Sequence, residues 1–167
     1  LPGQWAALII ATILLAGQVA AQDGPGGALQ AVAVSADNPA TVYTSGFGNF
    51  YMSDDSGNHW NVSSAGTMAW AIRFGPADLV ADPNAEHVVY AATQDYGVMY
   101  RVVGQPWAYG NGLSGAVRSV APHPDGQTVY AGTESGIYVS RDRGRNWDLL
   151  SDALGSGAGD GPAPGPC

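Results

Sequence analysis

The sequence contains no lysine, and its single cysteine is Cys167. One cysteine cannot form a disulfide within the chain, and the three histidines, His59, His87 and His123, lie too far apart for the ligand spacing of a metal site. All 6 basic residues are arginine, against 14 acidic residues, which gives a net charge of −8. Nucleic acids and anionic membranes bind clustered basic side chains, so this balance argues against both as partners. No metal ion or other cofactor is predicted.

Charged residues make up only 12% of the chain, whereas glycine and proline are frequent, with 24 and 11 occurrences. A hydrophobic content of 46% over 167 residues is enough for one globular core. The aromatic residues are spread along the whole chain. This composition is typical of many short strands joined by turns, so we predict an all-β fold.

The first 21 residues differ from the rest of the chain in being strongly apolar. Only Thr12 interrupts the apolar run from Trp5 to Gly17, and small residues follow as far as Ala21. This pattern predicts a signal peptide over 1–21, cleaved after Ala21. An uncleaved N-terminal anchor is the alternative, although the run is shorter than the roughly 20 residues that span a bilayer. We therefore expect an exported protein, periplasmic or extracellular, from a bacterium.

A turn motif with the pattern S-x-D-x-G-x-x-W occurs twice, as Ser53–Trp60 and as Ser140–Trp147. Serine opens a tight turn, aspartate accepts backbone N–H groups inside it, and glycine supplies a positive φ before the next strand. Each copy therefore predicts a turn between two antiparallel strands. The residues assigned this structural role are Ser53, Asp55, Gly57, Trp60, Ser140, Asp142, Gly144 and Trp147.

Two further landmarks show that the chain is built from repeats. Tyr43, Tyr90 and Tyr130 each follow a valine, at spacings of 47 and 40 residues, and three tryptophans at 60, 107 and 147 have the same spacings. A shared period of about 43 residues falls in the range of propeller blades. The middle copy is degenerate, because its turn, Arg101–Trp107, is one residue shorter and lacks the Ser and Asp.

The predicted organisation follows from this period. Three repeats cover about 28–66, 67–112 and 113–150, between a flexible lead-in over 22–27 and a disordered Gly/Pro/Ala tail over 151–167. The first strands of the three repeats are expected at Leu29–Ser35, Ala69–Phe74 and Ala116–Ala121. The Val-Tyr and Trp positions are expected to fill the space between neighbouring repeats.

The segment VYAGTESGIYVSRDRGRNW, from Val129 to Trp147, resembles the Asp-box, or BNR, repeats of sialidases, sortilin-type receptors, xyloglucan-cleaving glycosidases and photosystem II assembly factors. The resemblance covers about residues 28–150. It implies a partial β-propeller of about three four-stranded antiparallel blades, in which the box joins the third and fourth strands on the side away from the functional face. That superfamily contains enzymes and binding proteins, so the resemblance does not select a function.

The opposite face is the expected interaction surface, because it carries the loops between second and third strands. The candidate residues on it are Phe47, Asp95, Tyr96 and Glu134. Solvated loop tips are the alternative interpretation. Asp95 and Glu134 could form a carboxylate pair for acid–base chemistry, but a sialidase-like site also needs an arginine cluster, and half of the 6 arginines lie in the last box turn.

Three blades cannot close a ring, because closed propellers typically have about four to eight. We expect the two open faces to be covered by further blades of a longer chain, by a protein partner or by self-association, in that order of preference. The predicted function is that of a binding or assembly module for protein–protein interaction, without catalysis. The alternative is a fragment of a BNR-repeat glycoside hydrolase of sialidase-like or xyloglucanase-like type.

Overall fold

The computed structural model describes residues 28–46, 48–64, 76–84 and 88–152. Within these residues all regular structure is β-strand, arranged as three four-stranded sheets. This confirms the predicted all-β class. None of the described residues belongs to a helix long and apolar enough to cross a membrane. The predicted signal peptide, the lead-in, Phe47 and the tail from 153 onward lie outside the described residues.

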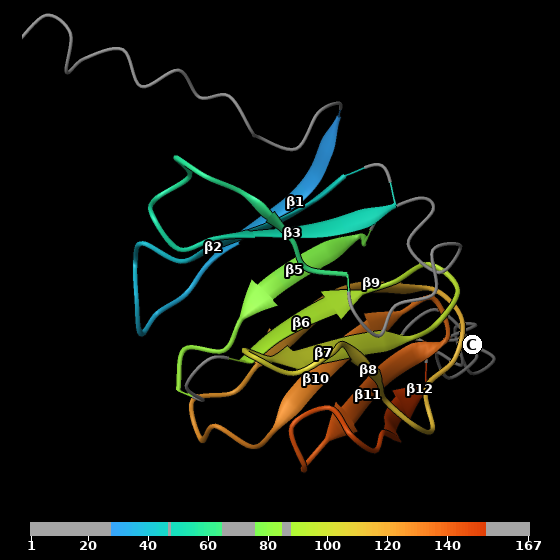
Figure 1. Ribbon diagram of the computed structural model, residues 1–167. Coiled ribbons are helices and arrows are strands. Elements are labelled where there is room, and N and C mark those ends of the chain that lie inside the picture. The colour runs from blue at the N-terminus through green and yellow to red at the C-terminus, as the bar shows by residue number, and fades with distance from the viewer. Residues whose placement is uncertain (1–27, 47, 65–75, 85–87, 153–167) are drawn as a thin grey trace, which may run out of the picture.

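Each sheet is one antiparallel blade whose strands pair in chain order (Figure 1). Blade 1 contains β1 (Leu29–Val34), β2 (Val42–Gly46), β3 (Asn49–Ser53) and β4 (Asn61–Val62). Blade 2 contains β5 (Asp78–Ala81), β6 (Val88–Ala92), β7 (Val98–Val102) and β8 (Ala108–Tyr109). Blade 3 contains β9 (Val117–Pro122), β10 (Val129–Thr133), β11 (Gly136–Ser140) and β12 (Asp148–Asp152).

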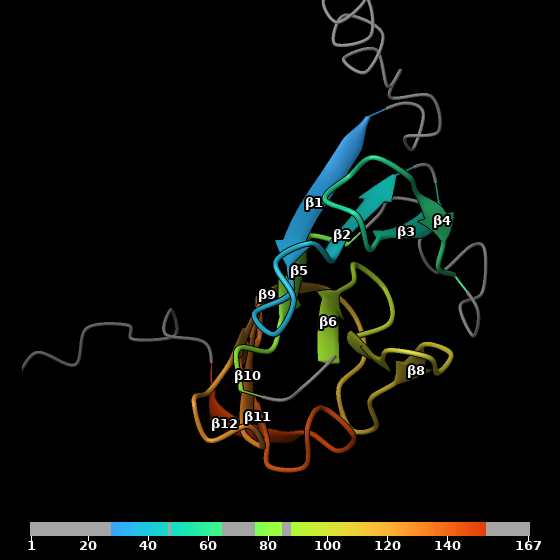
Figure 2. The same ribbon diagram turned by 60° about the vertical axis from the view of Figure 1, so that its left-hand side comes forward.

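The first strands of the blades lie at the centre of the arrangement. β1 contacts β5, and β5 contacts β9, so the three sheets fan out from these strands with blade 2 in the middle (Figure 2). All five residues of β6 are at most 5% exposed. A strand covered on both faces reads as a continuous apolar run, which explains the sequence Val-Val-Tyr-Ala-Ala.

Alternate side chains of β6 pack into different clusters. Val89 and Ala91 belong to the cluster shared with blade 1, whereas Val88, Tyr90 and Ala92 belong to the cluster shared with blade 3. Successive side chains on a strand point to opposite faces, so one short strand supplies both inter-blade cores.

The first strand of blade 2 was predicted in the wrong place. Ala69–Phe74 lies outside the described residues, and the sheet begins instead with Asp78–Ala81. Tyr90 pairs with Val80, ten residues upstream, just as Tyr43 pairs with Ala33. The segment at 69–74 is the more hydrophobic of the two. The first strand nevertheless lies at nearly the same distance before the Val-Tyr strand in every blade, since Tyr130 pairs with Ala121, nine residues upstream.

Candidate functional site

The second box turn is closed by the side chains of Ser140 and Asp142. The Ser140 hydroxyl donates to Asp142 Oδ1 over 2.8 Å and accepts from the Gly144 amide over 2.8 Å. Asp142 Oδ1 also accepts from the amides of Arg145 and Asn146, at 3.1 and 2.8 Å. Partial burial acts to raise the pKa of Asp142, but these hydrogen bonds outweigh it, so the pKa is lowered.

The first box turn has the same hydrogen bonds, except that the Asn58 amide donates to Asp55 O and not to the carboxylate. Ser53 Oγ lies 2.9 Å from Asp55 Oδ1 and 2.8 Å from the Gly57 nitrogen, and the His59 amide donates to Asp55 Oδ1 over 2.8 Å. Hydrogen bonds from the His59 amide and ring hold the pKa of Asp55 at about 2. The two copies are therefore one structural unit used twice.

Two consecutive positive φ angles define each box turn. They are 62° and 89° at Ser56 and Gly57, and 61° and 81° at Arg143 and Gly144. The left-handed region is uncommon for a residue other than glycine, so the rest of each turn must hold Ser56 and Arg143 in this conformation. Only the glycine was predicted to adopt this conformation.

The box turns lie at one end of the blades. The Ser56 amide donates to Ala40 O, and the Arg143 amide donates to Gln127 O, so each box contacts the turn between the first and second strands of its own blade. The loops between second and third strands join the other ends of those strands. Asp95, Tyr96 and Glu134 are therefore on the face opposite to the boxes.

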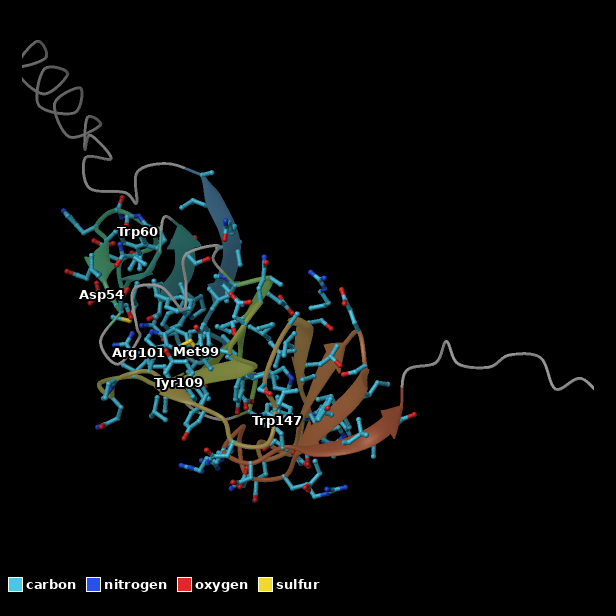
Figure 3. All side chains as sticks on the ribbon, turned by 90° about the vertical axis from the view of Figure 1, so that its right-hand side faces the viewer. Asp54, Trp60, Met99, Arg101, Tyr109 and Trp147 are labelled. Atoms are coloured by element: carbon cyan, nitrogen blue, oxygen red, sulfur yellow. The ribbon has the colours of Figure 1, made fainter. Side chains whose placement is uncertain are left out.

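The degenerate middle turn has an arginine at the position of the box serine. Arg101 pairs with Val89, as Ser53 pairs with Val42 and Ser140 with Val129, which confirms the one-residue shortening. Its Nε donates to Gln105 O over 2.9 Å, and its Nη1 donates to Ser63 Oγ on blade 1 (Figure 3). Burial lowers the pKa of this half-buried guanidinium. Arg101 thus makes one hydrogen bond within the turn and a second one to the neighbouring blade, which the box serine does not make.

Trp147 fills the interface between blades 2 and 3. The packed interface between two neighbouring blades is called a seam. Trp147 is 4% exposed and shares a cluster with Tyr90. A Cβ on Gly110 would lie 2.4 Å from Trp147 Nε1, and one on Gly144 would lie 3.1 Å from the Tyr90 ring. Glycine is therefore required at Gly110 so that the backbone of blade 2 can lie against the indole.

Trp107 fills the seam between blades 1 and 2 in a different way. Its ring stacks on Phe50, with centroids 4.1 Å apart, and its Nε1 donates to Ser63 O over 2.7 Å. In the box turns, by contrast, the indole Nε1 donates to the glycine carbonyl of its own turn, 3.0 Å away for both Trp60 and Trp147. Tyr43 lies in the same cluster as Trp107.

Among the loop candidates, Asp95 and Tyr96 lie on a loop held by backbone contacts. Tyr96 N donates to Thr93 Oγ1 over 3.0 Å, and the Gly115 amide donates to Asp95 O. The Tyr96 ring meets the Tyr109 ring edge to face, with centroids 6.1 Å apart. Desolvation, followed by the charge of Asp95, raises the pKa of Tyr96. Tyr109 was not among the predicted site residues. The sequence shows only that it lies two residues after Trp107.

Glu134 belongs to a separate arrangement on blade 3. Its carboxylate forms an ion pair with Arg118, whose hydrogen bond and charge lower the pKa of Glu134. In the described structure no hydrogen bond or ion pair joins Asp95 to Glu134. The described residues also contain no group of three or more His, Cys, Asp or Glu side chains placed to hold a metal ion.

The connection Gly110–Gly115, between blades 2 and 3, reaches the loop face only at its end. Gly115 bonds to the Asp95 loop, but Asn111 O accepts from the Trp147 amide, and the Asn111 amide donates to Arg145 O. The first half of this connection therefore packs on the box turn of blade 3.

No protein-family model matches the sequence, and no curated protein matches it. Among solved structures, the chain is similar to the GH74 enzyme of Niastella koreensis, with 22% identity over 75% of this chain and 23% of that one, at a TM-score of 0.57. It is similar to the GH74 xyloglucanase of Xanthomonas campestris, with 20% identity over 74% of this chain and 18% of that one, at a TM-score of 0.54.

The third similar structure is YCF48 from Cyanidioschyzon merolae, with 19% identity over 73% of this chain and 36% of that one, at a TM-score of 0.54. The chain thus spans between about a fifth and about a third of the length of these three structures. Together with the three blades and their box turns, these likenesses show the β-propeller fold.

Proposed function

We propose that the protein is an exported binding or assembly module whose loop face contacts a protein partner. The observation that carries the proposal is the Tyr96–Tyr109 pair, two partly buried aromatic side chains held edge to face beside Asp95. Aromatic side chains surrounded by polar groups are typical of the centres of protein interfaces. Phe47, on the corresponding loop of blade 1, is proposed to contribute to the same surface.

The scaffold beneath this pair is suited to binding because it is already organised. Thr93 Oγ1 donates to Gly97 O over 2.8 Å and accepts from the Tyr96 amide, so one buried hydroxyl closes the loop. Tyr96 also forms a parallel bridge with Gly115. A surface fixed before binding loses less conformational entropy on association.

The state of Glu134 supports binding over glycoside hydrolysis. A glycosidase needs a carboxylic acid that remains protonated until it donates, which requires a raised pKa. The ion pair with Arg118 lowers the pKa of Glu134 instead. With both carboxylates exposed and Glu134 committed to Arg118, these two described residues, Asp95 and Glu134, are not arranged as an acid–base pair.

The second candidate function is that of a fragment of a BNR-repeat glycoside hydrolase. The similarity to GH74 enzymes, one of them described as a xyloglucanase, favours it. In that case Asp95 and Glu134 would act on a polysaccharide together with groups from other blades.

Two assays separate the candidates. In the first, the immobilised chain is used as bait in a periplasmic and membrane extract of the source bacterium. A specific partner should be retained, lost on the double substitution Tyr96→Ala/Tyr109→Ala, and retained on Arg141→Ala, which changes an exposed residue of the box turn. If no partner is retained, or if one is retained equally by the double variant, the proposal is wrong.

In the second assay, the chain is incubated with xyloglucan and with sialosides. No reducing sugar or sialic acid should be released. Release that is abolished by Asp95→Asn or Glu134→Gln would replace the binding module with the hydrolase.

A further inference from the structure

The connection between blades 2 and 3 contains the only Asn-Gly pair of the sequence, Asn111 and Gly112. The main chain of Asn111 is fixed to the box turn of blade 3. Its amide donates to Arg145 O over 2.8 Å, and its carbonyl oxygen accepts from the Trp147 amide over 2.9 Å. Asn111 also forms a parallel bridge with Asn146. The side chain of Asn111, by contrast, is exposed.

Gly112 lies directly against the backbone of Trp147. Its φ is 86°, and a Cβ on it would lie 2.4 Å from Trp147 O, so glycine is required here. In the part of the chain that the structure describes, neither the Gly112 amide nor the Asn111 side chain takes part in a hydrogen bond. Both groups are therefore available to react with each other.

Asparagine is chemically labile because the next main-chain nitrogen can attack its side chain. At this site the Gly112 nitrogen loses its proton to hydroxide and forms a bond to Asn111 Cγ. The bond from Cγ to Nδ2 breaks, and ammonia leaves after taking a proton from water. Water then opens the five-membered imide at either carbonyl and gives aspartate or isoaspartate. The sequence of steps needs no oxidant or reductant.

The fold assists the first of these steps. Deprotonation of the Gly112 nitrogen places negative charge on the Asn111 carbonyl oxygen, because the peptide bond is delocalised. That oxygen already accepts a hydrogen bond from the Trp147 amide, and such a bond strengthens when its acceptor becomes charged. A donor held in advance where charge develops lowers the barrier to reaction. The contact that joins the two blades thus also activates Gly112.

The Asp-Gly pair at Asp125 and Gly126 of blade 3 is a contrast, since it could form the same imide. There the Gly126 amide donates to His123 O over 3.2 Å, and Asp125 Oδ1 accepts from the amides of Thr128 and Gln127, at 2.7 and 2.9 Å. These hydrogen bonds lower the pKa of Asp125, and the carboxylate that they keep ionised is a poor electrophile. The same kind of dipeptide is therefore protected in one turn and available in the other.

We propose that Asn111 is a site of spontaneous deamidation and that its isoaspartate product opens the seam between blades 2 and 3. In isoaspartate the main chain runs through the former side chain and is one methylene longer. Gly112 then cannot keep its place against Trp147 O, and the connection continues to Gly115, which bonds to the Asp95 loop. The aspartate product keeps the original chain length. No partner on the loop face enters into this proposal, so it is independent of the proposed function.

Mass spectrometry of the aged full chain tests the site. One sample is incubated folded at mildly alkaline pH and another in urea, and peptides are analysed for conversion of amide to acid at each asparagine. In the folded chain Asn111 should convert faster than every other described asparagine and at least as fast as it does in urea. An unchanged Asn111, or conversion that is slower in the folded chain than in urea, overturns the proposal.

The effect on the seam is measured separately with two variants. Asn111→Gln keeps a side-chain amide but would need a larger ring, so the same treatment should leave its melting temperature unchanged. Asn111→Asp carries the new charge without the extra methylene. The aged wild type, in which an isoaspartate-specific methyltransferase measures the product, should melt below both the fresh wild type and fresh Asn111→Asp. If aged wild type rich in isoaspartate melts like fresh Asn111→Asp, the seam does not open and that part of the proposal is wrong.

Discussion

The turns of blades 2 and 3 occupy equivalent places, but they orient the tryptophan between the blades in different ways. In blade 3 the Ser140–Asp142 hydrogen bonds close the turn, and Trp147 is oriented by its own Gly144. In blade 2, Arg101 and Trp107 both donate to Ser63 of the neighbouring blade. The comparison shows that the repeat conserves the buried tryptophan, whereas the means of orienting it can move from within the turn to the adjacent blade.

The largest expected effect tests whether the tryptophan belongs to the seam. Trp147→Ala should lower the free energy of unfolding by about 3–5 kcal/mol, because it removes a buried aromatic ring. Trp60 occupies the equivalent turn of blade 1, where no neighbouring blade is described. Trp60→Ala should therefore lower the free energy of unfolding by about 1 kcal/mol or less. Urea unfolding at low protein concentration measures both. Equal losses would mean that the turn, and not the seam, sets the contribution of the tryptophan.

A matched pair of glycines separates backbone strain from inter-blade contact. Gly57 and Gly144 have similar positive φ angles, 89° and 81°, but a Cβ meets the Tyr90 ring at 3.1 Å only at Gly144. Gly57→Ala should destabilise by about 1 kcal/mol from strain alone. Gly144→Ala should cost about 2 kcal/mol, and the excess should disappear in a Tyr90→Leu background. An excess that persists there would contradict the assigned contact.

Substitution of Arg101 tests how much its hydrogen bonds stabilise the degenerate turn. Arg101→Ala removes hydrogen bonds to Gln105 O and Ser63 Oγ and should destabilise by about 1–2 kcal/mol, discounted for partial exposure. Arg101→Lys should not restore stability, because the two bonds leave from different guanidinium nitrogens. Thermal unfolding compares the three proteins, with Arg118→Ala as the exposed control. Full recovery with lysine would show that charge alone suffices.

The smallest expected effect is the pH dependence that the carboxylate of an intact box contributes. The pKa of Asp55 is lowered to about 2 in the folded chain, so its contribution is complete above the ordinary aspartate pKa near 3.8 and is lost as pH falls toward 2. Asp55→Asn should make the fall of the melting temperature between about pH 4 and pH 2 less steep. Melting temperatures of the variant and wild type that change in parallel over this range would contradict the assignment.

The repeat and its boxes could be predicted from the sequence, because turn chemistry and spacing are local. The Tyr and Trp spacings predicted three repeats, and the structure has three four-stranded sheets; the shortening at Arg101 was visible before the structure. The first strand of blade 2 was misplaced because hydrophobicity favoured 69–74 over Asp78–Ala81, and pairing with β6 is a contact that no local pattern records.

The candidate site was harder to predict. Asp95 and Tyr96 were recognised as loop residues, but their link to Gly115 and the edge contact with Tyr109 join segments that are more than ten residues apart in the chain. Likewise, the ion pair that occupies Glu134 comes from Arg118 on β9. Sequence alone identified which loops share a face; the neighbours of each side chain depended on how the strands pair.

The central claim is that each seam joins the tyrosine of one blade to the tryptophan of the next. A double-mutant cycle with Tyr90→Leu and Trp147→Leu measures that pair directly. The coupling free energy should fall between about 0.5 and 3 kcal/mol, as for residues in contact. The same cycle with Tyr43→Leu and Trp147→Leu, which lie in different seams, should be additive within about 0.5 kcal/mol. Additive losses for Tyr90 and Trp147 would contradict the account.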